Sequence, residues 1–208
     1  MKYAVIFHAD AESIYTIEYC RQNMHEIKFL ILPKSANQDS IMFSDTSFEM
    51  IQFAARCMNF ATKTAESDDE LEEILSEEKN SVDGLAVGNI HSRMHYVKLS
   101  SMCKQHNRVF TATLWHQDKM QAISALVNNK YSMIIIRTNK MNADFLGQKI
   151  DRANIQAISD DTKAGGSFGT LVTAGPLYQQ EIKIKSGYAT MHDQYKGVYN
   201  ISEICPLR

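Results

Sequence analysis

The stretch AVIFHADAESIY, residues 4–15, places two acidic residues between an apolar run and the start of a predicted helix. A strand, a tight loop and a helix form the layout of a phosphate-binding loop, because the first N–H groups of a helix point at a bound anion. Here Asp10 and Glu12 stand where a phosphate would lie, and the loop contains no glycine. The layout therefore favours an anion, whereas the two carboxylates favour a cation such as Mg²⁺.

Each residue of this loop has a plain structural interpretation beside the functional one. Ser13 could contact a phosphate, and it could equally belong to the N-cap of the helix. Asp10 and Glu12 could hold a metal ion, and they could also be exposed acids that the helix dipole stabilises. The loop alone leaves an anion site, a cation site and an ordinary helix start open.

Other chemically capable residues give weaker signals. His91 and His95 are four residues apart at a predicted helix start and could share a metal ion with His8. No third ligand follows at a defined spacing, so a surface position is favoured for this pair. Trp115 is better explained by packing at a strand end than as a substrate platform. The sequence contains no G-x-S-x-G motif, and neither a Walker loop nor G-x-G-x-x-G follows the first strand.

The elements that position these residues alternate along the first part of the chain. Five short apolar runs predict strands buried on both faces. They are residues 3–7, 27–32, 84–88, 108–115 and 131–138. Helical periodicity covers residues 13–24, 46–60, 68–78, 92–106 and 118–129. This alternation predicts an α/β fold with a five-stranded, mostly parallel, doubly wound sheet, whose ligands bind at the carboxyl ends of the strands.

The composition changes after about residue 150. AGGSFGTLVTAGPLY, residues 164–178, has five glycines or prolines in fifteen residues, and two alternating segments of hairpin type follow it. We therefore predict an α/β domain over residues 1–151 and a small β-rich C-terminal part over residues 152–208.

Composition excludes several classes of function. The chain has 208 residues and a formal net charge of −2, which argues against nucleic-acid binding through a basic surface. We expect no membrane span, because no apolar run reaches ~18 residues, and no signal peptide, because the chain enters its first strand directly. The four cysteines are scattered without a CxxC pair, which is typical of reduced thiols in a cytoplasmic protein.

The order of several motifs resembles that of the N-type ATP pyrophosphatases, a PP-loop family whose best-defined members are diphthine–ammonia ligases. The family's Ser-Gly-Gly-Lys-Asp-Ser loop aligns with residues 8–13, and its Ser-x-Met-Phe-His segment aligns with SIMFS, residues 40–44. Further segments in the same order are VGNIHSRMHYVKLSSMCKQ (87–105), TLWHQD (113–118), NADFLGQKID (142–151) and KAGGSFGTLVTAGPLY (163–178). The resemblance spans nearly the full length and implies the adenine nucleotide alpha hydrolase-like fold.

The resemblance implies an ATP-dependent C–N ligase with Mg²⁺ as metal. Family enzymes join a substrate carboxylate to the α-phosphate of ATP, release pyrophosphate, and pass the acyl-adenylate to ammonia with release of AMP. In diphthine–ammonia ligases the acceptor is the diphthine of translation elongation factor two, and the product is diphthamide. A homodimer is compatible with this resemblance.

The residues of the implied site are identified by their aligned positions and not by their residue types. The resemblance assigns nucleotide binding to His8, Ala9, Asp10, Ala11, Glu12, Ser13 and Gly88, substrate binding to Ser92, His95, Lys98, Gly165, Gly166 and Thr170, and metal binding to Asp10 and Glu12. It assigns no catalytic residue.

Several charged groups of the family are replaced in this chain. The loop lysine is Ala11, and the loop glycines are Ala9 and Asp10, where a left-handed backbone costs about 1–2 kcal/mol. The three glutamates of the Gly-rich motif fall on Ala164, Ser167 and Gly169, and the histidine of the Ser-x-Met-Phe-His segment falls on Ser44. A second hypothesis is therefore a catalytically degenerate relative that binds AMP, another ligand or a protein partner.

Overall fold

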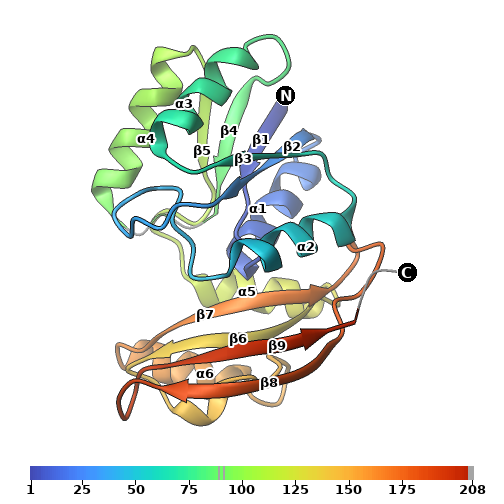
Figure 1. Cartoon of the computed structure of the whole chain (residues 1–208), viewed down its shortest axis with the longest axis vertical. Coiled ribbons are helices and arrows are strands. Elements are labelled where there is room, and N and C mark those ends of the chain that lie inside the picture. Colours follow the sequence, from blue (N-terminus) through green and yellow to red (C-terminus); the bar gives the residue numbers. More distant parts are fainter. Residues whose placement is uncertain (89, 91, 206–208) are drawn as a thin grey trace. The chain divides into compact units, whose positions relative to one another are not determined.

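The computed structural model describes residues 1–88, 90 and 92–205, and the chain divides into two compact units (Figure 1). The N-terminal unit comprises Met1–Lys119, and the C-terminal unit comprises Met120–Arg208. No helix among the described residues is long and apolar enough to cross a membrane.

The N-terminal unit is built on a parallel five-stranded sheet with the order β3-β2-β1-β4-β5. The strands are β1 (Lys2–Ile6), β2 (Glu26–Pro33), β3 (Thr62–Ala65), β4 (Gly84–Val87) and β5 (Val109–Ala112). β1 lies at the centre, where Val5 is opposite Leu30 of β2 and Ala86 of β4. The direction of the connections reverses between β1 and β4, so this is the switch point where ligands of such sheets bind. The predicted α/β fold with a five-stranded parallel sheet is confirmed.

Helices follow the strands, as the sequence predicted. They are α1 (Ala11–Gln22), α2 (Phe48–Met58), α3 (Asp68–Glu77), α4 (Arg93–Gln105) and α5 (Lys119–Asn128). The side chains of Asp10, Ser47, Ser67 and Ser92 cap the first four helices by accepting an N–H from the residue three positions on. Right-handed connections place α1 and α2 on one face of the sheet, and α3 and α4 on the other (Figure 1).

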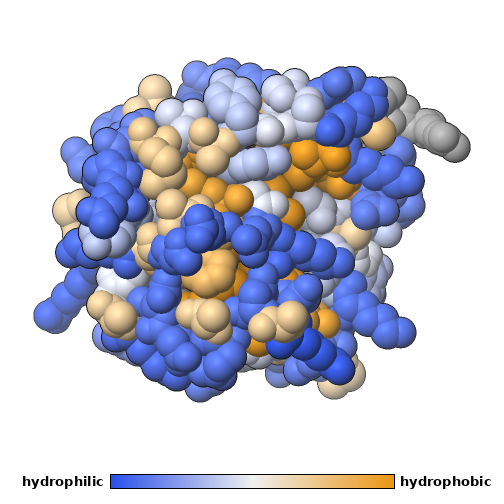
Figure 2. All heavy atoms as spheres, turned by 90° about the horizontal axis from the view of Figure 1, so that it is seen from below, coloured by the Kyte–Doolittle hydropathy of each residue, from blue (hydrophilic) through white to orange (hydrophobic). Residues whose placement is uncertain are grey.

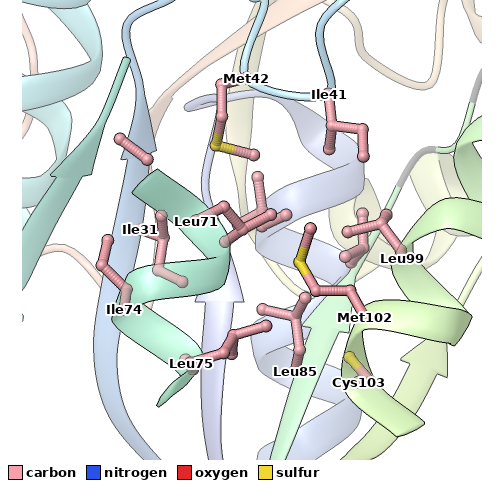
Figure 3. Packing of buried hydrophobic residues seen from close by; sticks show 14 of the residues in the cluster. Ile31, Ile41, Met42, Leu71, Ile74, Leu75, Leu85, Leu99, Met102 and Cys103 are labelled. Atoms are coloured by element: carbon pink, nitrogen blue, oxygen red, sulfur yellow. The ribbon is translucent and has the colours of Figure 1, made fainter. Parts of the chain in front are cut away.

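The core beneath α3 and α4 is apolar and closely packed (Figure 3). Leu71 and Leu75 of α3 and Met102 of α4 lie over Ile31 of β2 and Leu85 of β4. This layer holds the carboxyl edge of the sheet and the starts of both helices in place.

The C-terminal unit contains an antiparallel sheet with the order β7-β6-β9-β8. It also contains α5 from Met120 on, and its other elements are β6 (Ser132–Asn139), a 3-10 helix (Ala143–Phe145), α6 (Ile155–Lys163), β7 (Ser167–Ala174), β8 (Ile184–Met191) and β9 (Gly197–Ile204). Figure 2 shows the face of the molecule seen from below, where hydrophobic patches are bordered by hydrophilic side chains. The β-rich character expected for the end of the chain is confirmed.

Two expectations about the strands and one about the boundary need correction. Residues 131–138 do not form a fifth parallel strand, because they form β6, where Ile135 pairs antiparallel with Thr170 of β7. The fifth parallel strand is β3, a short polar strand at the sheet edge that the apolar pattern missed. Because β6 pairs with β7 and β9, the units divide after Lys119 rather than after residue 151.

Shortening a core side chain of α3 tests this packing. Leu75 is fully buried, so Leu75→Ala should lower the free energy of unfolding by about 2–5 kcal/mol in urea denaturation followed by circular dichroism. The adjacent Ser76 is exposed, and Ser76→Ala should change it by no more than about 0.5 kcal/mol. Similar effects of the two substitutions would show that α3 does not pack as described.

Candidate functional site

The loop after β1 turns at Ala9, whose φ of 61° lies in the left-handed region. Glycine usually occupies such a position, because a Cβ atom strains this conformation. Asp10 has an extended backbone with φ −92° and ψ 172°, so the second replaced glycine position carries no such strain. The chain thus keeps the turn of a phosphate-binding loop while placing an alanine at its strained position.

The carboxylate of Asp10 caps the N-terminus of α1. Its Oδ1 accepts the Ser13 N–H at 2.8 Å and also accepts the Ser13 hydroxyl. The hydroxyl oxygen of Ser13 in turn accepts the His8 N–H at 2.9 Å. Asp10 is therefore the N-cap of α1, and the side chain of Ser13 is held within the loop.

Glu12 is a buried acid that pairs with a lysine. The residue is 3% exposed, and its Oε1 lies 2.6 Å from Nζ of Lys119, the first residue of α5. Its Oε2 has no hydrogen-bond partner among the described residues. Burial raises the pKa of Glu12 against the attraction of Lys119, and the charge of Asp10 raises it further. The interpretation of Glu12 as an exposed acid is wrong.

These contacts do not fit a polyphosphate bound at the loop. The Ser13 N–H at the start of α1 is bonded to Asp10, and the Lys119 ammonium group is paired with Glu12. A phosphate at this position would lie beside two carboxylates, and a like charge at ~4 Å costs roughly 4 kcal/mol at an intermediate dielectric.

A metal ion bound at Asp10 and Glu12 would have to displace the present partners of these carboxylates, Ser13 and Lys119. In the part of the chain that the structure describes, no three His, Cys, Asp or Glu side chains are grouped to hold a metal ion. Mg²⁺ at Asp10 and Glu12 would compete with Ser13 for one carboxylate and with Lys119 for the other.

Gly88 lies at the end of β4, against the first turn of α1. A Cβ atom at this position would lie 2.3 Å from the Glu12 carbonyl oxygen and 2.9 Å from the Thr16 hydroxyl oxygen. That hydroxyl donates to the Glu12 carbonyl at 2.8 Å and lies 2.7 Å from the Thr113 hydroxyl after β5. The close approach of two backbones is thus sufficient to explain this glycine.

A second polar cluster gathers around Asp68, the first residue of α3. Its Oδ1 accepts the Ser40 hydroxyl at 2.7 Å and the Ile41 N–H at 2.9 Å, and its Oδ2 accepts Lys98 Nζ at 2.6 Å. Burial raises the pKa of Asp68, but the hydrogen bonds from Lys98 and Ser40 outweigh it and hold the pKa below its usual value. Asp68 therefore joins the segment 40–44 to α4, a role that the sequence did not indicate.

The α4 residues singled out by the sequence lie near this cluster. Ser92 caps α4 by accepting the His95 N–H at 3.1 Å, and His95 Nε2 lies 3.1 Å from the Asp39 carbonyl oxygen. His95 thus contacts the segment that follows β2 directly, and Lys98 is joined to it through Asp68, whereas Ser92 serves as the cap of α4. His91, the other member of the predicted histidine pair, lies outside the described residues.

The aromatic residues at the end of β5 pack on one another. The ring of Trp115 stacks on that of Tyr96 with centroids 4.7 Å apart, and Tyr96 contacts Phe110 edge-on at 5.3 Å. This arrangement agrees with the packing interpretation of Trp115.

The remaining predicted site residues lie in the C-terminal unit. Gly165 follows α6 with a φ of 98°, which is typical of a glycine that ends a helix. A Cβ atom on Gly166 would lie 2.4 Å from Met141 Cγ, and Thr170 is buried in β7. Ala164 is the C-cap that follows α6, and Ser167 and Gly169 lie in β7; none of the three residues carries a carboxylate.

Comparison with known proteins gives a consistent result for both units. The family model described as the diphthamide synthase N-terminal domain matches residues 1–107, and that of the diphthamide synthase C-terminal domain matches residues 118–206. Diphthine–ammonia ligases of Bos taurus and Homo sapiens are each 23% identical over 229 residues, covering 92% of this chain and 86% of the relative. A predicted subunit of tRNA methyltransferase from Methanocaldococcus jannaschii aligns with a TM-score of 0.49 and 13% identity, over 85% of this chain and 98% of that chain.

A pair of glycine substitutions tests the strained turn. Ala9→Gly should change the free energy of unfolding by less than about 0.5 kcal/mol. Relief of the left-handed strain stabilises the folded state. The loss of a buried methyl group and the greater freedom of the unfolded chain destabilise it by a similar amount. Ala11→Gly, at the start of α1, should destabilise by about 1–2 kcal/mol, since no strain is relieved there. Urea denaturation of both variants measures the difference, and equal losses would place Ala9 outside the left-handed region.

The acid side of the stability profile tests the Asp68 cluster. The folded-state pKa of Asp68 lies below 3.8, so its stabilisation is complete above pH 3.8 and is lost as the pH falls through the lower value. Asp68→Asn should cost about 1–2 kcal/mol at pH 7, and the cost should shrink toward pH 3 in urea denaturation. Asp69→Asn, at the exposed neighbour, should have little effect at either pH, and a cost for Asp68→Asn that does not vary with pH would contradict the cluster.

Proposed function

The chain belongs to the diphthamide synthase family, and on that premise we propose that it is a binding member of the family rather than an ATP-dependent ligase. The observation that carries this proposal is the Asp10 carboxylate, which bonds the Ser13 N–H at the start of α1, where a phosphate would otherwise bind. Its ligand is expected to lack a polyphosphate group.

The electrostatics of the loop support this proposal. The positive end of a helix dipole attracts one anion, and Asp10 supplies that anion from within the chain. For a polyphosphate to bind there, Asp10 would have to leave its cap, which costs about 1 kcal/mol, and the buried Glu12 would still repel the ligand. A ligand that ends in a single phosphate, or carries none, avoids most of this repulsion.

The C-terminal unit supports the same proposal. The positions that carry glutamates in the family's Gly-rich motif are occupied here by Ala164, Ser167 and Gly169. Carboxylates are the groups that would bind a metal ion or take up a proton during amide formation. A chain without them at these positions can keep the fold and a ligand, whereas the ligase chemistry loses its charged groups.

A second candidate is the family reaction itself, the ATP-dependent amidation of diphthine on translation elongation factor two through an acyl-adenylate. The left-handed turn at Ala9 favours it, because the loop keeps its backbone shape. Lys119 favours it as well, because its ammonium group reaches the loop in which the family lysine is Ala11. For this reaction the ammonium group of Lys119 would have to leave its ion pair with Glu12 and bind a phosphate of ATP instead.

Nucleotide titration separates the two candidates. Calorimetry with AMP and with ATP, each with and without Mg²⁺, should show ATP binding at least about tenfold weaker than AMP, because the added phosphates meet the loop carboxylates. Asp10→Gly combined with Ala11→Lys should recover at least about tenfold in ATP affinity, whereas Ser76→Lys, which adds a lysine at an exposed position of α3, should not.

The opposite result would favour the ligase. Micromolar binding of Mg-ATP, together with AMP and pyrophosphate release in the presence of diphthine-bearing acceptor and ammonia, would overturn the binding proposal. If neither nucleotide binds, the ligand is not an adenine nucleotide, and a protein partner becomes the next probe.

A further inference from the structure

β8 is a long edge strand that the described part of the chain leaves uncovered. It is the last strand in the order β7-β6-β9-β8 (Figure 1), and Tyr188 and Met191 are 60% and 42% exposed. β7, at the opposite edge, is mostly buried, and the edge strands of the parallel sheet, β3 and β5, have four residues each. Exposed edges are usually protected by a charge, a proline or a bulge, yet Gly187–Met191 has no charged residue or proline and pairs with β9 in regular register.

The hydrogen bonds to β9 show which backbone groups of β8 point to the free edge. The N–H of His192 donates to the carbonyl oxygen of Lys196 at 2.8 Å, so this pair of residues faces inward across the hairpin. Along an antiparallel strand the residues bond alternately to one side and to the other. The residues that face away from β9 are therefore Gly187, Ala189 and Met191.

This set of three residues is symmetric about Ala189. We propose that β8 pairs with β8 of a second copy of this chain, antiparallel, about a twofold axis at Ala189. In this register Ala189 faces Ala189 of the partner subunit, and Gly187 faces Met191 of the partner subunit. All of these residues present outward backbone groups, so the two strands can form about six N–H···O=C bonds. The two four-stranded sheets then become one continuous sheet.

The side chains suit the same register. Tyr188 lies opposite Thr190 of the partner subunit, in a pair without mutual backbone bonds, where side chains approach most closely. Pairs of an aromatic and a β-branched residue stabilise neighbouring strands, and this pair occurs twice. Between Gly187 and Met191 the register places no like charges opposite each other.

Charges at the two ends of the paired segment are complementary. Lys185 and Asp193 are each four residues from Ala189, on opposite sides, so the twofold axis brings Lys185 toward Asp193 of the partner subunit at both ends. Lys185 is paired with Glu203 of its own chain at 2.6 Å, and its ammonium group has further donors for a second acid.

A second copy is the favoured occupant of this edge because the contact closes on itself. Each chain uses the same strand, and after pairing neither copy leaves β8 exposed for a third. An unrelated strand could accept the backbone bonds, but it would not share the symmetry about Ala189 or the complementary ends. This proposal does not depend on the ligand of the loop after β1.

Sedimentation analysis of the full chain up to about 0.5 mM tests the pairing. We expect a dimer with a dissociation constant of about 10–100 μM, because strands of this length bury less surface than a standard interface. Ala189→Pro should raise the dissociation constant at least about tenfold, since it removes the N–H on the axis. That N–H points away from β9, so the variant should remain folded by circular dichroism.

A matched pair of lysine substitutions separates loss of the interface from general charge effects. Ala189→Lys places a lysine beside its own copy on the twofold axis and should raise the dissociation constant at least about tenfold. Ala157→Lys makes the same change at an exposed residue of α6 and should leave the constant within about twofold of the original.

A mixing experiment tests the register itself. The double variants Tyr188→Lys/Thr190→Lys and Tyr188→Glu/Thr190→Glu should each be monomeric alone, because like charges face each other. An equal mixture of the two should dimerise with a dissociation constant within about tenfold of the original, since opposite charges then meet at both positions. A monomer at every concentration, an unchanged dimer in Ala189→Pro, equal effects of Ala189→Lys and Ala157→Lys, or no dimer in the mixture would each overturn the proposal.

Discussion

The contact between the end of β4 and the first turn of α1 is the constraint on which the N-terminal unit depends. Gly88 leaves no room for a Cβ atom against the Glu12 carbonyl, so α1 must begin directly beside the carboxyl end of the central strands. To reach that position from β1, the chain turns through a left-handed residue at Ala9. The shape of the loop is thus dictated by the packing of strand against helix, whatever the loop binds.

Much of the fold could be predicted from the sequence because buried strands and capped helices leave strong local patterns. The pattern predicted the strands β1, β2, β4 and β5 and the helices α1 to α5. The run at 131–138 was assigned to the wrong sheet, because the inner strand of an antiparallel sheet is as continuously apolar as a parallel one. β3 was missed because TKTA, a short edge strand, has no apolar pattern to detect.

The contacts of the candidate site were less predictable, because the residues that contact one another there come from distant parts of the chain. The sequence located the loop by its strand and helix pattern, and it pointed to Gly88 and Ser92 only through the resemblance to the family, as nucleotide-binding and substrate-binding positions. It did not show that Glu12 is paired with Lys119, or that Asp68 holds both Ser40 and Lys98. Contacts of this kind arise only when the sheet brings its loops to one edge, and a single sequence carries no signal for them.

The differences between this loop and the family motif are consistent with a helix that begins without a phosphate. A lysine near the positive end of a helix dipole is unfavourable unless a bound anion neutralises it, and this chain has Ala11 there. An aspartate at the N-cap supplies the missing anion and stabilises the free helix, typically by about 1 kcal/mol. The buried charge of Glu12 then needs a cation of its own, which Lys119 provides. These changes compensate one another, as the proposed binding role expects of a loop that holds its own carboxylates where the family's loop would hold a phosphate.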